Sequence, residues 1–250
     1  MTSVNNVHFI GTSHIARESV KNIKEFIETE KPDIVAVELD FQRLKTLLEK
    51  RQDRISIKNI GLVKEIGITG FVFAYIASMV QKRIGKAVNT QAGSDMLTAV
   101  KLAKKNNLQV ALIDQDVNIT LKKISKEMKF KEKMRILWDI IRGVFTKNSD
   151  AKELGIENMD LNKVPAPEIV EKLLKKTKNR YPTFHKVLVE DRNKYMIKKL
   201  LMLSQKFSEK KILAVVGAGH KKEMEDLLSI KLSKINSGKA DYVFSHSIDI

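Results

Sequence analysis

The sequence has 250 residues, of which 43% are hydrophobic, and this is enough for a sizeable core in one large domain or two small ones. The absence of cysteine excludes disulfides, thiol nucleophiles, iron–sulfur clusters and cysteine-ligated zinc. No run of about 18 apolar residues predicts a membrane-spanning helix. No N-terminal stretch resembles a signal peptide, so we expect a cytoplasmic protein.

The formal net charge of +16 is concentrated in two stretches. Residues 122–147 include 9 basic and 3 acidic side chains, and residues 171–211 include 13 basic and 4 acidic ones. Such stretches bind phosphate backbones or anionic membranes, or they form solvated helix faces. Aromatic residues make up only 6% and do not interleave with these charges, so we do not expect nucleic acid as a partner.

The first half alternates strand and helix patterns. Residues 7–10 predict a buried strand, and residues 17–29 repeat apolar positions at helical spacing until Pro32 ends the pattern. Residues 34–39 predict a second strand. The inner face of the helix after it is predicted to comprise Phe41, Leu44, Leu47 and Leu48. This order predicts a parallel sheet with right-handed crossovers.

Two further strands are predicted at residues 108–113 and 211–216, with an edge strand at residues 242–244. The helix before the third strand and the helix after the fourth have apolar positions at helical spacing. These positions are Met96, Leu97, Val100 and Ala103 in the first helix, and Met224, Leu227 and Leu228 in the second.

Residues 66–85 are mostly apolar but too short to span a bilayer, so they predict a buried helix, with membrane-surface contact as the alternative. Residues 117–207 contain no strand pattern and predict a large helical insertion, interrupted by a loop at residues 163–167. We therefore expect one α/β domain over residues 1–250, with a mostly parallel central sheet, flanking helices and this insertion.

Polar residues follow each of the four main strands. The first strand is followed by Gly11-Thr-Ser-His14, the second by Glu38, the third by Asp114 and Asp116, and the fourth by Gly217-Ala-Gly-His220. In open parallel sheets ligands bind at the carboxyl ends of strands, so these residues should share one edge. Two histidines with carboxylates suit a divalent Zn, Mn, Co or Fe ion.

Each of these signals has a purely structural alternative. The histidines can cap helices, Gly-Ala-Gly can be a tight turn, and Asp114 and Asp116 can be N-caps. The repetition of Gly-x-x-His at two strand-to-helix turns favours a ligand site, because glycine lets the backbone approach a ligand.

Arg192 is unusual because it lies on an apolar helical stripe. Its partner is either Asp191 or a strand-end carboxylate, unless the side chain extends to solvent. The other histidines fall outside the predicted site: His8 is expected to be structural, and His185 and His246 to be surface or capping residues.

Taken in order, the motifs resemble the TraB/PrgY pheromone-shutdown family, including its archaeal members. The matching pieces are Gly11-Thr-Ser-His14, Pro32-Asp-Ile-Val-Ala-Val-Glu-Leu-Asp40 with Arg43, Gly93-Ser-Asp-Met96, Ile113-Asp-Gln-Asp116 with Thr120-Leu121, Asp191-Arg-Asn-Lys-Tyr-Met196, and Val215-Val-Gly-Ala-Gly-His220. The family is grouped with the Tiki metalloproteases and with erythromycin-esterase-like and ChaN-like proteins.

The resemblance implies paired histidines at His14 and His220, an acidic member at Glu38, and accompanying arginines at Arg43 and Arg192. Two motifs depart from the usual pattern. Glu-Arg-Asp appears as Asp191-Arg192-Asn193, and Asp-Arg-Asp appears as Asp114-Gln115-Asp116. Longer family members carry a membrane region after this domain, so a natural short form and an excised domain both stay open.

These observations lead to a metal-dependent hydrolase, most simply a peptidase, as the first hypothesis. His14, Glu38 and His220 would hold the metal, and Asp114 and Asp116 would assist in binding it. Glu38 or Asp191 would take a proton, and Arg43 or Arg192 would stabilise an oxyanion or a substrate carboxylate.

The alternative is a non-catalytic module that sequesters a peptide in the same cleft. A binder of nucleic acid or anionic membranes acting through the basic stretches is the third hypothesis. Homo-oligomerisation and peripheral membrane contact stay open.

Overall fold

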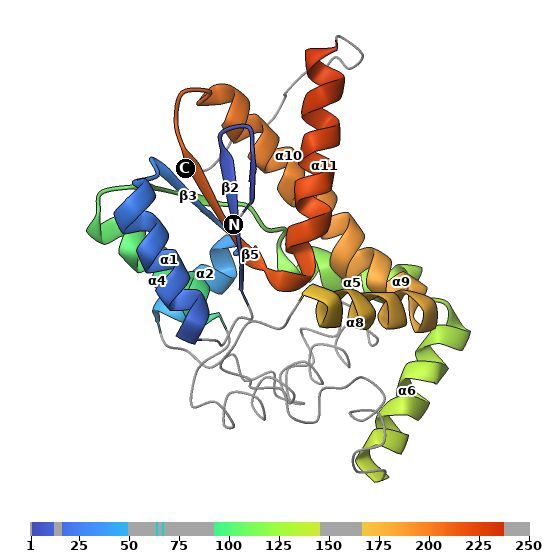
Figure 1. Cartoon of the computed structure of the whole chain (residues 1–250). Coiled ribbons are helices and arrows are strands. Elements are labelled where there is room, and N and C mark those ends of the chain that lie inside the picture. The colour runs from blue at the N-terminus through green and yellow to red at the C-terminus, as the bar shows by residue number, and fades with distance from the viewer. Residues whose placement is uncertain are drawn as a thin grey trace.

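The computed structural model describes residues 2–12, 17–49, 64, 67, 93–145 and 167–237. Within these ranges the chain has an α/β fold (Figure 1). Its elements are β1 Thr2–Val4, β2 Val7–Thr12, α1 Arg17–Glu30, β3 Ile34–Val37, α2 Phe41–Leu48, α4 Ser94–Lys105, β4 Gln109–Leu112, α5 Val117–Glu127, α6 Phe130–Phe145, α8 Pro167–Arg180, α9 Pro182–His185, the π-helical segment η1 Lys186–Glu190, α10 Asp191–Lys206, β5 Ile212–Gly217 and α11 Ala218–Asn236.

The described strands form one sheet in the order β1-β2-β5-β3-β4. The four strands predicted from the sequence, β2, β5, β3 and β4, are parallel, and only β1 runs antiparallel to its neighbour β2. Among the described strands β5 comes last in sequence, and it lies between β2 and β3. Its register pairs Thr12 with Gly217 and Val37 with Val215, so the carboxyl ends of these strands meet at one edge.

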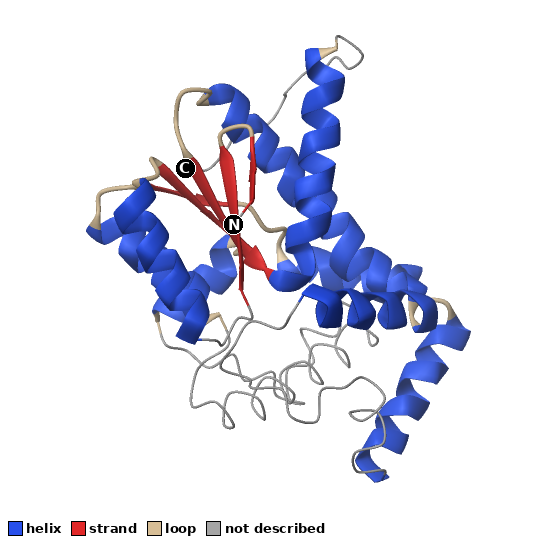
Figure 2. Ribbon diagram, in the orientation of Figure 1, coloured by secondary structure: helices blue, strands red, loops and turns tan. Residues whose placement is uncertain are grey.

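Helices cover both faces of this sheet (Figure 2). On one face Ile212, Ala214 and Val216 of β5 pack in a cluster with α10 and α11. On the other face Leu213 and Val215 pack in a cluster with α1 and α4. Because the central strands are buried on both faces, they read as continuous apolar runs rather than as an alternating pattern.

Between β4 and β5 the described residues form α5, α6, α8, α9, η1 and α10. One of these helices belongs to the main core, because Met196, Ile197 and Leu200 of α10 are buried against the sheet. A smaller cluster joins Ile124 of α5 to Val187 of η1. The expected insertion is therefore partly a structural layer of the α/β core.

The predicted inner face of α2 is partly wrong. Leu47 is buried and Leu44 packs against the core, whereas Phe41 and Leu48 are exposed. The apolar stripe of α2 is wider than the surface that this short helix buries against the core. Only the side with Leu44 and Leu47 is therefore covered.

The predicted helix at residues 66–85 and the predicted edge strand at residues 242–244 lie outside the described residues. None of the helices described is long and apolar enough to cross a bilayer.

Candidate functional site

Glu38 follows the last residue of β3 and joins two strands. Its backbone N–H bonds the carbonyl of Val215 at 3.0 Å, which continues the pairing with β5. Its buried side chain also reaches β5, because Oε2 accepts a hydrogen bond from the Gly217 amide at 2.6 Å. The carboxylate is therefore fixed at the shared edge of the sheet, where the sequence predicts it.

Three aspartates follow the neighbouring strands. Asp114 lies after β4, and its Oδ1 accepts a hydrogen bond from the Gln115 amide at 2.7 Å. Asp116 is the N-cap of α5 and accepts from the Asn118 amide at 2.7 Å, so the capping alternative is correct for Asp116. Asp40 is the N-cap of α2.

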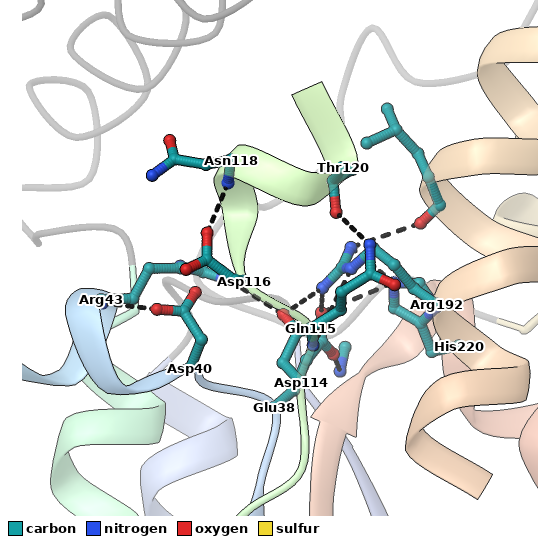
Figure 3. A network of polar contacts seen from close by, with 12 residues as sticks. Glu38, Asp40, Arg43, Asp114, Gln115, Asp116, Asn118, Thr120, Arg192 and His220 are labelled. Atoms are coloured by element: carbon teal, nitrogen blue, oxygen red, sulfur yellow. Dashed lines mark hydrogen bonds and ion pairs between the residues drawn. The ribbon is translucent and has the colours of Figure 1, made fainter. Parts of the chain in front are cut away.

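The guanidinium of Arg192 lies at the centre of the cluster (Figure 3). Its Nη2 is 2.6 Å from Glu38 Oε1 and 2.6 Å from Asp114 Oδ2, and its Nε is 3.0 Å from Asp114 Oδ1. Arg192 thus binds Asp114 with two nitrogens and bridges it to Glu38. The strand-end carboxylates are its partners, and Asp191 instead contacts Lys123 at 3.4 Å.

The charges in this cluster stabilise the ionised form of Arg192. Burial alone would lower the pKa of Arg192, but the charges of Glu38 and Asp114 outweigh burial and raise its pKa above the ordinary arginine value. Arg43 adds a second cation, because its Nη1 is 3.4 Å from Asp114 Oδ2. The Arg43 side chain is 33% exposed against 14% for Arg192, so Arg43 is the more accessible arginine.

His220 lies in the first turn of α11, three residues after β5 ends at Gly217, and is buried. Its Nδ1 is 2.6 Å from Asn193 Oδ1, and its Nε2 is 3.3 Å from Arg192 Nη1. Because a guanidinium nitrogen only donates, Nε2 is the acceptor and Nδ1–H donates to Asn193. The imidazole is therefore neutral, with the Nε2 lone pair facing Arg192 and Glu38.

Two atoms of a kind that can bind metal lie close together in the cluster, and Arg192 contacts both of them. His220 Nε2 is 3.5 Å from Glu38 Oε1, a separation typical of two ligands that each lie about 2.1 Å from one ion. His14, the third predicted ligand, lies outside the described residues. Among the residues that are described, no three histidine, aspartate or glutamate side chains form a metal-binding group.

The sequence reasoning missed several members of this region. Asn193 orients His220, and its place beside Arg192 on α10 is the signal that could have identified it. Gln115 Nε2 donates to Thr120 Oγ1 at 3.2 Å, which ties the end of β4 to α5. The prediction for His185 was wrong, because it is buried 3.5 Å from Glu190 Oε1 rather than placed on the surface.

The fold and the cluster define an α/β protein in which a helix-borne arginine binds the carboxylates at two strand ends beside a histidine. The chain belongs to the TraB/PrgY/gumN family, whose sequence profile matches residues 2–230. This range includes all the residues of the cluster and His14.

An uncharacterised protein of Methanocaldococcus jannaschii is 35% identical over 216 residues, which are 86% of this chain and 51% of that protein. The chain therefore spans about half the length of that relative.

Proposed function

We propose that this protein is a metal-dependent hydrolase acting on peptides, with a divalent ion held by His14, Glu38 and His220. The observation that carries this proposal is the pair of donors at the edge of the sheet: His220 Nε2 is 3.5 Å from Glu38 Oε1. The Nδ1–H of His220 is engaged by Asn193, so that Nε2, which faces Arg192 Nη1 at 3.3 Å, is the ring atom that would bind the ion.

The third donor is supported by the register of the sheet. Thr12 ends β2 and pairs with Gly217, which ends β5, and each is followed within three residues by a histidine. Two peptide units span at most about 7 Å, so position 14 stays in the neighbourhood of this strand end. Imidazole and carboxylate together suit Zn, Mn, Co or Fe.

The remaining contacts of the cluster suit outer positions around such an ion. Arg192 and the Gly217 amide each bind one oxygen of Glu38, and Asn193 binds the far side of His220. Partners of this kind orient metal ligands and are found around most protein metal sites. In this proposal Asp114 binds and orients Arg192, and Asp116 caps the N-terminus of α5.

A divalent ion bound there would polarise a substrate carbonyl and make a bound water more acidic. Glu38 and Asp191 are both paired, with Arg192 at 2.6 Å and with Lys123 at 3.4 Å, and we assign the proton acceptor to Glu38 because it lies beside His220. Arg43, the more exposed arginine, is the better candidate to bind an oxyanion or a substrate carboxylate.

Elemental analysis of protein purified without chelator, together with peptide turnover, tests this proposal. The variants are His14→Ala and His220→Ala, with His246→Ala as the control because His246 lies outside residues 2–230 that match the family. We expect bound metal and turnover in the wild type and in the control, and neither in the two site variants. Metal retained by both site variants would refute the assignment.

The same experiment distinguishes the alternative. A protein that binds peptide at this site but does not cleave it in any metal-loaded form would be a sequestering module rather than a hydrolase.

A further inference from the structure

Helix α6 uses its acidic side chains to attach to the rest of the protein. Glu132 is buried and accepts hydrogen bonds from the backbone amides of Thr183 at 3.3 Å and Phe184 at 3.0 Å. Asp139 binds Arg180, whose Nε lies 2.8 Å from Asp139 Oδ2. Both acids of α6 therefore face α8 and α9, where Glu132 is bound by backbone amides and Asp139 by the Arg180 guanidinium.

The opposite side of α6 is apolar and exposed. Phe130, Met134 and Trp138 are 76%, 46% and 65% exposed, and their spacing of four residues places them along one stripe. Lys131, which is exposed, follows Phe130 in the sequence and gives the stripe a basic flank, whereas Arg135 donates to the Arg180 carbonyl at 2.8 Å. The helix extends away from the sheet in Figure 1.

We propose that this face of α6, defined by Phe130, Met134, Trp138 and Lys131, binds the surface of an anionic lipid bilayer. A helix with an apolar stripe and basic flanks lies in the plane of a membrane interface, with the apolar side chains among the lipids and the cations near the headgroups. The 16 residues of α6 would lie flat over about 24 Å.

Charge favours a bilayer over the other occupants of such a face. A second copy of the chain would bring the same basic flanks against each other, in a protein that already carries a net charge of +16. Nucleic acid would engage the cations but leave the apolar stripe in water. An anionic bilayer engages both features, and this inference does not depend on the proposed hydrolase activity.

The chain contains its own reporter for this contact, because Trp138 is its single tryptophan. We expect its fluorescence to shift to the blue with mixed phosphatidylcholine–phosphatidylglycerol vesicles, and the protein to sediment with them. With phosphatidylcholine vesicles alone both signals should be weak, and added salt should reduce binding to the anionic vesicles.

Matched variants test whether binding depends on this face of α6 rather than on net charge or on exposed apolar residues elsewhere on the protein. Met134→Glu should weaken binding by about tenfold or more, whereas Ile230→Glu, at a 51% exposed residue of α11, should leave it unchanged. Lys131→Glu should weaken binding about fivefold. Lys21→Glu, which changes the net charge equally on α1, should have a much smaller effect.

Circular dichroism first establishes that each variant is folded. Equal losses in Lys131→Glu and Lys21→Glu, or unchanged binding in Met134→Glu, would overturn the proposal. So would a blue shift of Trp138 that rises with protein concentration in the absence of vesicles, since that would assign the face to a second copy of the chain.

Discussion

Replacing Arg192 with methionine should destabilise the fold strongly, because it removes the cation between two buried carboxylates. Arg192 makes contacts of 2.6 Å to Glu38, and of 2.6 Å and 3.0 Å to Asp114. Breaking a buried ion pair by removing one partner costs about 3–5 kcal/mol. Glu38 keeps its bond from Gly217 and Asp114 keeps Arg43, so we expect the lower end, about 3 kcal/mol.

The free energy of unfolding, measured by urea denaturation with circular dichroism, gives this value directly. Lys198→Met, an exposed position on the same helix, is the control and should change stability by under about 0.5 kcal/mol. A loss no larger than that of Lys198→Met would refute this account of the cluster.

Three further changes test other parts of the site. Burial raises the pKa of Asp40, so its ionised form costs stability at neutral pH, and that cost disappears as the pH falls through the raised pKa. Asp40→Asn keeps the capping oxygen, and in urea denaturation it should be at least as stable as the wild type at neutral pH and lack this pH-dependent component. Asn193→Leu removes the acceptor of the His220 Nδ1–H, and metal titration should show affinity lowered about 10–100-fold. Lys175→Glu, at an exposed position of α8, should shift the free energy of unfolding by under about 0.5 kcal/mol, and a larger loss would show that this lysine makes a structural contact.

The four parallel strands could be predicted because each is a short apolar run bounded by turns. Their order could not, since β5 lies between β2 and β3 although nearly 100 residues separate it from β4. Local patterns encode which segments become strands, and long-range packing decides which strands become neighbours. The strand β1, Thr2–Val4, was missed because it has three residues and no alternating pattern.

The candidate site, like the fold, could be predicted from the sequence only in part. Glu38 and Asp114 were predicted from their place after strands, and the expectation that Arg192 binds a strand-end carboxylate was one of three left open, beside Asp191 and extension to solvent. The sequence could not decide between that carboxylate and Asp191, because either one can pair with a buried guanidinium. Asn193 was missed although it stands beside Arg192 in the sequence, because its contact with His220 depends on how α10 packs against α11.

The position of β5 also makes the site a property of the whole fold. Glu38 receives the Gly217 amide only because β5 pairs with β3, and Arg192 reaches Glu38 only because α10 packs on the same sheet. The two carboxylates lie in the first half of the chain, whereas Arg192 and His220 lie in the second half. Until β5 enters the centre of the sheet, Glu38 lacks its amide partner. The polar cluster and the sheet should therefore form together, because each buried carboxylate is stable only with partners that the complete topology supplies.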